Sequence, residues 1–145
     1  LVASMRLTPE DALEKLNLRL QAKYREVEQK ERMWEERQTE DAEFLLVGFG
    51  LSARICRSAL STLRRAGVKA GLLRPITLWP FPSEAVARAA RGRRGVLVVE
   101  MNAGQMVEDV RLAVGGEAPV EFYGTLGGIT PEVDEIVERI KTYGR

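Results

Sequence analysis

The sequence predicts a three-layer α/β/α domain with a mostly parallel sheet, preceded by a long helix. Two observations lead to this prediction. From Phe44 onward, short apolar runs alternate with amphipathic stretches, as expected for strands that are each followed by a helix. Residues 1–43 differ, because they contain no glycine and only one proline, Pro9. We therefore divide the chain into a linker helix region, residues 1–43, and an α/β domain, residues 44–145.

The linker region is expected to form one helix from Thr8 to about Thr39. Thr8 is a candidate N-cap, and Pro9 fits the first helical position. Apolar residues at spacings of three and four form a stripe on the first half, whereas the residues beyond Val27 are nearly all charged, as on a solvated face. This stripe favours packing against another domain or subunit, or self-association of the isolated chain. Its members are Leu13, Leu16, Leu20, Tyr24 and Val27.

Helix boundaries in the domain are marked by residue type. Pro82-Ser83-Glu84 and Thr130-Pro131-Glu132 are typical of helix starts, and Gly67 is typical of a helix end. We expect strands near 44–49, 68–73, 95–100 and 119–123, and helices near 52–66, 83–91, 103–114 and 131–142.

Composition excludes several classes of function. With 22 basic and 21 acidic residues, the chain has no electrostatic signature of a nucleic-acid or membrane partner. It has no histidine, and its one cysteine, Cys56, is expected to be an inert apolar residue. The usual general base, most zinc sites and a four-thiolate iron–sulfur cluster are thereby excluded. We expect a cytoplasmic chain that is not catalytic alone and binds no metal or cofactor itself.

One motif suggests a nucleotide cofactor. Gly48-x-Gly50-x-x-Ala53 satisfies the loose form of the dinucleotide fingerprint, in which a glycine turn leads from a strand into a helix. A dinucleotide site also requires a carboxylate at the end of the second strand, and here that strand ends in Arg74. Because an arginine suits a 2′-phosphate, a free-standing NAD(P)-binding domain is the alternative to a purely structural turn.

Polar groups follow the third strand of the predicted sheet. Glu100 ends an almost entirely apolar strand and needs a partner, for which Arg74 and Arg111 are the candidates. Asn102 is either a functional group or the cap of the next helix. The glycines between Tyr123 and Pro131 form either an anion-binding nest or a flexible turn, and the turn is the commoner case.

Three loops should meet at one edge of the sheet if its strands are parallel, namely Arg74–Pro82, Met101–Met106 and Tyr123–Thr130. Their aromatic, methionine and arginine content is typical of an interface. For Trp79 and Phe81 the alternative is that they cover the sheet edge as core residues. The predicted interface residues are Arg74, Trp79, Phe81, Glu100, Asn102, Gln105, Met106 and Tyr123.

Four long stretches resemble the α subunit of the 2-oxoacid:ferredoxin oxidoreductases, in the part that follows its thiamine-pyrimidine domain. They occur in the family's order and span most of residues 44–131: LLVGFGLSARICRSAL, GLLRPITLWPFP, VLVVEMNAGQMVEDVRLAV and PVEFYGTLGGITP. The lead-in NLRLQAKYREVEQKE is most similar to the branched-chain 2-ketoisovalerate type.

The resemblance implies a fold like the transketolase C-terminal domain, with a mixed five-stranded sheet in which one strand can run antiparallel. The pattern above assigns four strands and leaves the fifth open. The resemblance also implies that Gly48 and Gly50 serve a tight turn in a sheet that is Rossmann-like in appearance only.

The implied function is that of a structural and subunit-interaction domain at the C-terminus of the α subunit. In such enzymes thiamine diphosphate and magnesium lie between the N-terminal part of this subunit and the β subunit, while other chains or domains, including ferredoxin-type subunits, hold the iron–sulfur clusters. The whole enzyme decarboxylates a 2-oxoacid, transfers the acyl group to coenzyme A and passes two electrons to ferredoxin. The resemblance thus implies as partners the rest of the α subunit, the β subunit and the ferredoxin-type subunits.

Overall fold

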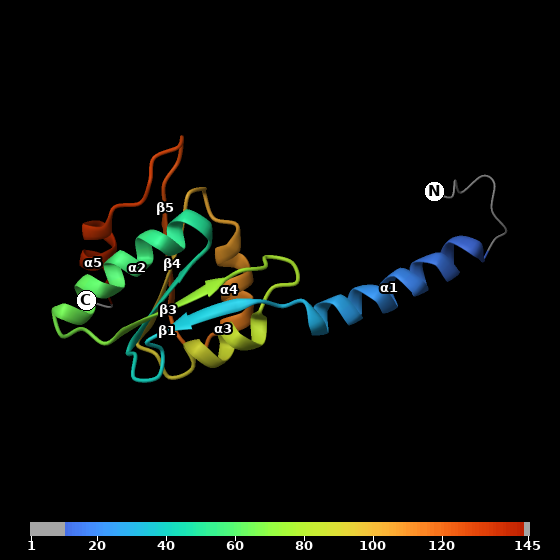
Figure 1. Ribbon diagram of the computed structural model, residues 1–145, viewed down its shortest axis with the longest axis horizontal. Helices are drawn as coiled ribbons and strands as arrows, with labels where there is room; N and C mark the ends of the chain where they lie inside the picture. The colour runs from blue at the N-terminus through green and yellow to red at the C-terminus, as the bar shows by residue number, and fades with distance from the viewer. Residues whose placement is uncertain (1–10, 144–145) are drawn as a thin grey trace.

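The computed structural model describes residues 11–143, and in it a five-stranded sheet lies between two layers of helices (Figure 1). The strand order is β1-β3-β2-β4-β5. The four strands β2 to β5 are parallel, and β1 pairs with β3 antiparallel. This arrangement confirms the predicted fold class. The strands are β1 (Trp34–Arg37), β2 (Phe44–Gly48), β3 (Ala70–Pro75), β4 (Gly95–Glu100) and β5 (Val120–Gly124).

Two helices cover each face of the sheet. One face packs against α2 (Gly50–Arg65) and α5 (Val133–Thr142), and the other against α3 (Ser83–Ala90) and α4 (Met106–Val114). The remaining helix, α1 (Ala12–Lys30), projects away from the sheet (Figure 1) and buries none of its side chains. Within residues 11–143 no helix combines the length and apolarity needed to cross a membrane.

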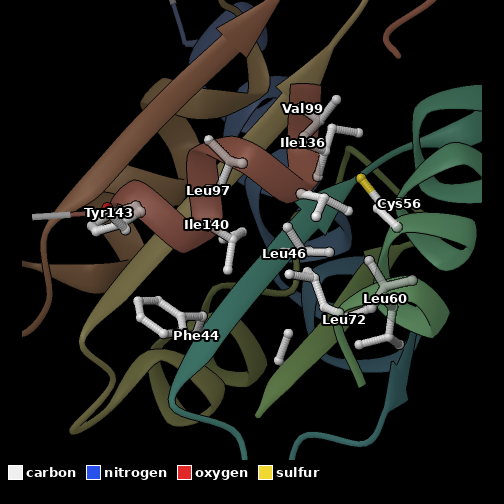
Figure 2. Close-up of a cluster of buried hydrophobic side chains, with 14 residues drawn as sticks. Phe44, Leu46, Cys56, Leu60, Leu72, Leu97, Val99, Ile136, Ile140 and Tyr143 are labelled. Atoms are coloured by element: carbon white, nitrogen blue, oxygen red, sulfur yellow. The ribbon is translucent and has the colours of Figure 1, made fainter. Parts of the chain in front are cut away.

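Alternation along the strands divides the core in two. In β2, Leu46 faces α2 and α5, whereas Leu45 and Val47 face α3 and α4. Figure 2 shows the first cluster, in which Tyr143 closes one end by donating its hydroxyl to the Pro119 carbonyl oxygen at 2.9 Å. Burial raises the pKa of Tyr143 to about 12. The central strands are therefore apolar on both sides, as expected for a parallel sheet covered on both faces.

The predicted single helix from Thr8 to about Thr39 is wrong at its C-terminal end. The helix ends at Lys30, and Trp34–Arg37 form β1, the fifth strand of the sheet. Its predicted start at Thr8 lies outside the described residues. The Ile76 amide donates to the Met33 carbonyl oxygen at 2.9 Å, so a contact distant in sequence ties this segment to the end of β3.

Strand β1 presents different charges to the two faces of the sheet. On the α3 side, Arg88 pairs with Glu36 at 2.6 Å and lies over the Trp34 ring. Burial raises the pKa of Glu36, but hydrogen bonds from Thr39, Arg88 and Trp34 outweigh burial and lower that pKa below its usual value. The intervening residues, Glu35 and Arg37, lie on the α2 side.

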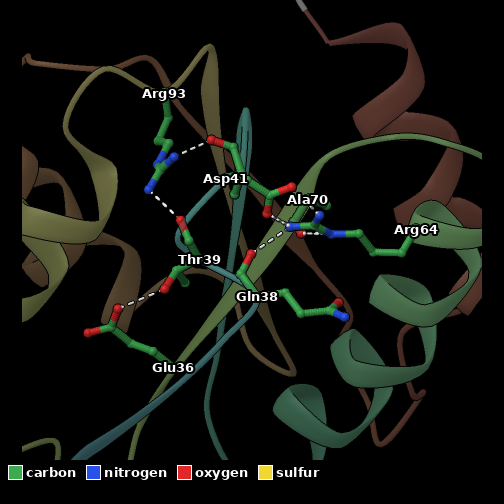
Figure 3. Close-up of polar contacts among 8 residues, drawn as sticks. Glu36, Gln38, Thr39, Asp41, Arg64, Ala70 and Arg93 are labelled. Carbon is green, nitrogen blue, oxygen red and sulfur yellow. Dashed lines mark hydrogen bonds and ion pairs between the residues drawn. The ribbon is translucent and has the colours of Figure 1, made fainter.

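Two arginines hold the loop between β1 and β2 (Figure 3). Arg64 of α2 donates to both carboxylate oxygens of Asp41, at 2.9 and 2.8 Å, and hydrogen bonds from Arg64 hold the pKa of Asp41 below its usual value. It also donates to the carbonyl oxygens of Gln38 and Ala70, each at 2.6 Å. Arg93 approaches the same loop from the α3 side and donates to the carbonyl oxygens of Thr39, Ala42 and Ala89.

We predict that Arg93→Met lowers the free energy of unfolding by about 1–3 kcal/mol, because backbone carbonyls in the loop lose their donor while remaining partly buried. Urea denaturation of the chain measures this change. The matched control is Arg91→Met, since Arg91 is exposed and should change the free energy by less than about 0.5 kcal/mol. Equal effects of the two substitutions would show that Arg93 does not hold the loop.

Candidate functional site

A groove opens at the carboxyl ends of the parallel strands, between β2 and β4. The chain leaves β2 through α2 toward β3 on one side, and returns from β3 through α3 to β4 on the other. Ligands and partners of open α/β sheets bind at such a switch point. The groove measures about 460 Å³ and is formed by residues 49–52, 99–102, 105 and 106 with Leu78 and Asp109.

The groove combines apolar side chains with a polar margin. Phe49, Leu51 and Leu78 are 42%, 46% and 44% exposed, which is high for residues of their size and type. Asn102, Gln105 and Asp109 line the same groove. Gathered apolar side chains flanked by polar ones are characteristic of a contact surface.

Glu100 is buried at this edge and is satisfied by backbone amides. Its carboxylate accepts hydrogen bonds from the amides of Met106 and Val107, both at 2.9 Å, at the start of α4. The carboxylate also lies at the positive end of the α4 dipole. The predicted arginine partners are wrong, because Arg74 contacts Glu35 and Arg111 pairs with Glu108. The negative charge of Glu100 thus anchors α4 to the end of β4.

Asn102 shapes the loop between Glu100 and α4. Its amide nitrogen donates to the Glu100 carboxylate at 3.1 Å, and its side-chain oxygen accepts from the Gly104 amide at 2.7 Å. Asn102 therefore makes a local turn, and Glu100 caps the helix in its place. Because these contacts fix the backbone of the loop, Gln105 and Met106 have defined positions in the groove.

The glycine turn that opens α2 explains the apparent dinucleotide fingerprint. A Cβ on Gly48 would lie 3.0 Å from the Ala53 backbone nitrogen, and Gly50 has a φ of +55°. Both positions therefore require glycine for the close strand-to-helix turn, whatever binds nearby. Arg74, which would meet a 2′-phosphate, instead lies among the residues Glu35, Arg37 and Arg57.

Four of the eight predicted interface residues line the groove, namely Glu100, Asn102, Gln105 and Met106. The other four lie elsewhere on the surface. Trp79 is 58% exposed and meets the Tyr24 ring of α1 edge to face, and Phe81 packs partly against the core beside it. The Tyr123 ring lies under the guanidinium of Arg139, whose central carbon is 4.6 Å from the centre of that ring.

The loop after β5 forms a closed turn beside the groove. Thr125 donates its amide to the Glu100 carbonyl oxygen at 3.1 Å, and its hydroxyl donates to the Ile129 carbonyl oxygen at 2.6 Å. Leu126 and Ile129 at its tip are strongly exposed. These contacts favour the turn interpretation of the glycine segment and place the loop next to the end of β4.

Sequence reasoning missed Phe49, Leu51, Leu78 and Asp109 as groove residues. Phe49 and Leu51 lie inside the glycine motif. The spacing of that motif predicts a dinucleotide site or a tight strand-to-helix turn, and it does not indicate that these two side chains are exposed. The available signal was that these residues flank Gly50 at the end of a parallel strand, where open sheets place their crevices.

We predict that Glu100→Gln lowers the free energy of unfolding by about 1–3 kcal/mol, because a neutral side chain replaces the carboxylate that accepts from the α4 amides. Glu117→Gln is the matched control, since Glu117 is exposed. Both variants can be compared by urea denaturation. An unchanged midpoint for Glu100→Gln would show that the charge of this carboxylate does not stabilise α4.

Comparison with known proteins gives one family match and several relatives. Residues 42–136 match the family described as pyruvate:ferredoxin oxidoreductase core domain II. Ketoisovalerate oxidoreductase subunit VorB of Methanothermobacter marburgensis is 46% identical over 131 residues, which are 90% of this chain and 37% of that protein. The chain therefore spans little more than a third of this curated relative.

Solved structures share the fold at low sequence identity. The 2-oxoglutarate:ferredoxin oxidoreductase from Magnetococcus marinus, solved with 2-oxoglutarate, coenzyme A and succinyl-CoA bound, has a TM-score of 0.74 and 22% identity, covering 93% of this chain and 23% of that chain. A split-gene transketolase, solved as an inactive tetramer of its beta subunit, has a TM-score of 0.61 and 20% identity, covering 70% of this chain and 39% of that chain. The transketolase-like fold implied by the sequence is thus confirmed, and the family match extends over the sheet and its covering helices: the chain belongs to the pyruvate:ferredoxin oxidoreductase core domain II family.

Proposed function

We propose that this chain is the C-terminal structural and subunit-contacting domain of the α subunit of a thiamine-diphosphate-dependent 2-oxoacid:ferredoxin oxidoreductase. The observation that carries the proposal is the identity with the ketoisovalerate oxidoreductase subunit, which extends over 131 residues rather than over the sheet alone. The family match supports this proposal over a free-standing NAD(P)-binding domain.

The reaction proposed for the parent enzyme is oxidative decarboxylation of a 2-oxoacid to an acyl-CoA, with reduction of ferredoxin. A branched-chain 2-oxoacid is the proposed substrate, supported by the name of the relative at 46% identity. The rest of the α subunit, the β subunit and ferredoxin-type subunits are the proposed partners, and the cytoplasm is the proposed location. Relatives that are themselves subunits support assembly with further chains.

The residues of this chain do not fit an iron–sulfur cluster or a metal ion. A cluster would need several thiolates, whereas the sequence holds only Cys56, which is buried and whose pKa burial raises to about 12. In the part of the chain that the structure describes, no three His, Cys, Asp or Glu side chains are grouped so as to hold a metal ion. We therefore assign magnesium and the iron–sulfur clusters to parts of the parent enzyme outside this chain. The family resemblance supports the same location for thiamine diphosphate.

The groove is the proposed contact with those parts. It has no histidine and no exposed thiol to perform chemistry, but it exposes Phe49, Leu51 and Leu78 beside polar side chains. Glu100 and Asn102 hold the groove loop before α4 in place, so a partner would meet an ordered segment there. Trp79 and Tyr123, which lie outside the groove, extend the proposed interface onto the neighbouring surface.

We predict that the double substitution Leu51→Ala and Leu78→Ala destabilises the intact enzyme and leaves this 145-residue chain unchanged when it is isolated. Both side chains are exposed in the chain, and burial of each in an interface would contribute about 1–2 kcal/mol. Thermal unfolding and sedimentation of the two forms measure the difference.

Leu112→Ala is the matched control, because Leu112 is 84% exposed and lies on α4 outside the groove. It should alter neither form. The groove is not the contact if the double variant lowers the melting temperatures of the isolated chain and of the enzyme equally. The same conclusion follows if it lowers neither melting temperature.

A further inference from the structure

A second surface feature lies at the β1–β3 edge of the sheet, beside α2. Four arginines border a small recess between the sheet edge and α2, together with Glu35, Ala53 and Leu72. None of these residues lines the groove. The arginines are Arg37 of β1, Arg74 of β3, and Arg54 and Arg57 of α2.

The fold brings these arginines together from three elements. In the β1–β3 pairing, Glu35 lies opposite Arg74 and Arg37 lies opposite Leu72, so all four occupy one face of the sheet. That face is covered by α2, since Leu72 belongs to the core cluster beneath it. The spacing of three between Arg54 and Arg57 places both on one side of α2.

Charge in the recess is unbalanced. The only carboxylate among the lining residues is Glu35, which pairs with Arg37 and lies 3.5 Å from Arg74. Across residues 11–143, no hydrogen bond or ion pair is made by the guanidinium of Arg54 or Arg57. The α2 sequence GLSARICRSALSTLRR contains no acidic residue that would compensate. A chain of net charge +1 thus concentrates positive charge at one place.

The shape and the donors of the recess suit the end of an anion. Arg74 Nε is buried without a hydrogen-bond acceptor, and buried polar groups normally have one. The planar fork of arginine matches the oxygens of phosphate and carboxylate groups. The space between the side chains is about 20 Å³, enough for one or two oxygen atoms but not for a whole nucleotide.

We propose that the Arg37–Arg54–Arg57–Arg74 recess binds the terminal phosphate group of a small molecule. The group would place one or two of its oxygens in the recess, supply the acceptor that Arg74 Nε lacks and offset the repulsion among four like charges. The confinement of the arginines to one recess, rather than along an extended surface, favours a compact oxyanion over an acidic peptide.

The test is titration of the full 145-residue chain with inorganic phosphate at constant ionic strength, followed through the Nε–H signals of arginine in ¹H–¹⁵N NMR spectra. Saturable shifts of the Arg74, Arg54 and Arg57 signals are expected. The double variant Arg54→Gln/Arg57→Gln should weaken binding at least about tenfold, because two charge-assisted donors are lost. Both residues are exposed on α2, and thermal unfolding checks that the variant remains folded.

The matched control is Arg65→Gln/Arg91→Gln, which removes the same charge at exposed positions outside the recess and should bind phosphate as the original chain does. Non-saturating shifts, or equal weakening by the two double variants, would show that phosphate only screens the surface charge. A glutamate-rich peptide that shifts the same signals at lower concentration than phosphate would also overturn the proposal, in favour of a protein partner.

Discussion

The hydrogen bonds between the Glu100 carboxylate and the Met106 and Val107 amides hold the start of α4 at the carboxyl end of β4. Strand β4 lies between β2 and β5, so whatever fixes its carboxyl end also fixes the loops on both sides. The same residue accepts the Thr125 amide through its carbonyl oxygen. A buried carboxylate is costly unless it is compensated, and here the start of α4 provides the compensation. One charged residue thus orders the groove loop before α4 and connects it to the loop after β5.

The second constraint lies in the edge strand β1, whose two sides carry different side chains. In β1, Trp34 and Glu36 interact with Arg88 of α3, while Glu35 and Arg37 border the arginine recess beside α2. Since side chains alternate along a strand, a shift of one residue in the β1–β3 register would exchange these sets. The Met33 contact with Ile76 and the loop held by two arginines oppose such a shift.

Most of the fold follows from the sequence because its central strands are short and apolar and its helices begin after recognisable residues. Strand β1 was missed because the segment WEER has no apolar alternation: it lies at the edge, both its faces are partly exposed, and its charges continue the pattern of the preceding helix. Only contacts distant in sequence select the strand, and propensity cannot supply these. The sequence indicates that Glu100 needs a partner, but it points to cationic side chains, because no residue type marks a backbone amide as the donor. The exposure of Leu51 and Leu78 is likewise a property of the assembled loops.

The groove at the switch point is the proposed contact between this domain and the rest of its enzyme. Hydrogen exchange of the intact enzyme, compared with that of the isolated chain, measures whether the groove is covered. The proposed role predicts slower exchange in the enzyme for the amides of residues 49–52, Leu78 and residues 101–106, with little change in the central strands, which are already buried. Equal exchange of these groove amides in both forms, with slowing confined to other surfaces, would contradict the claim.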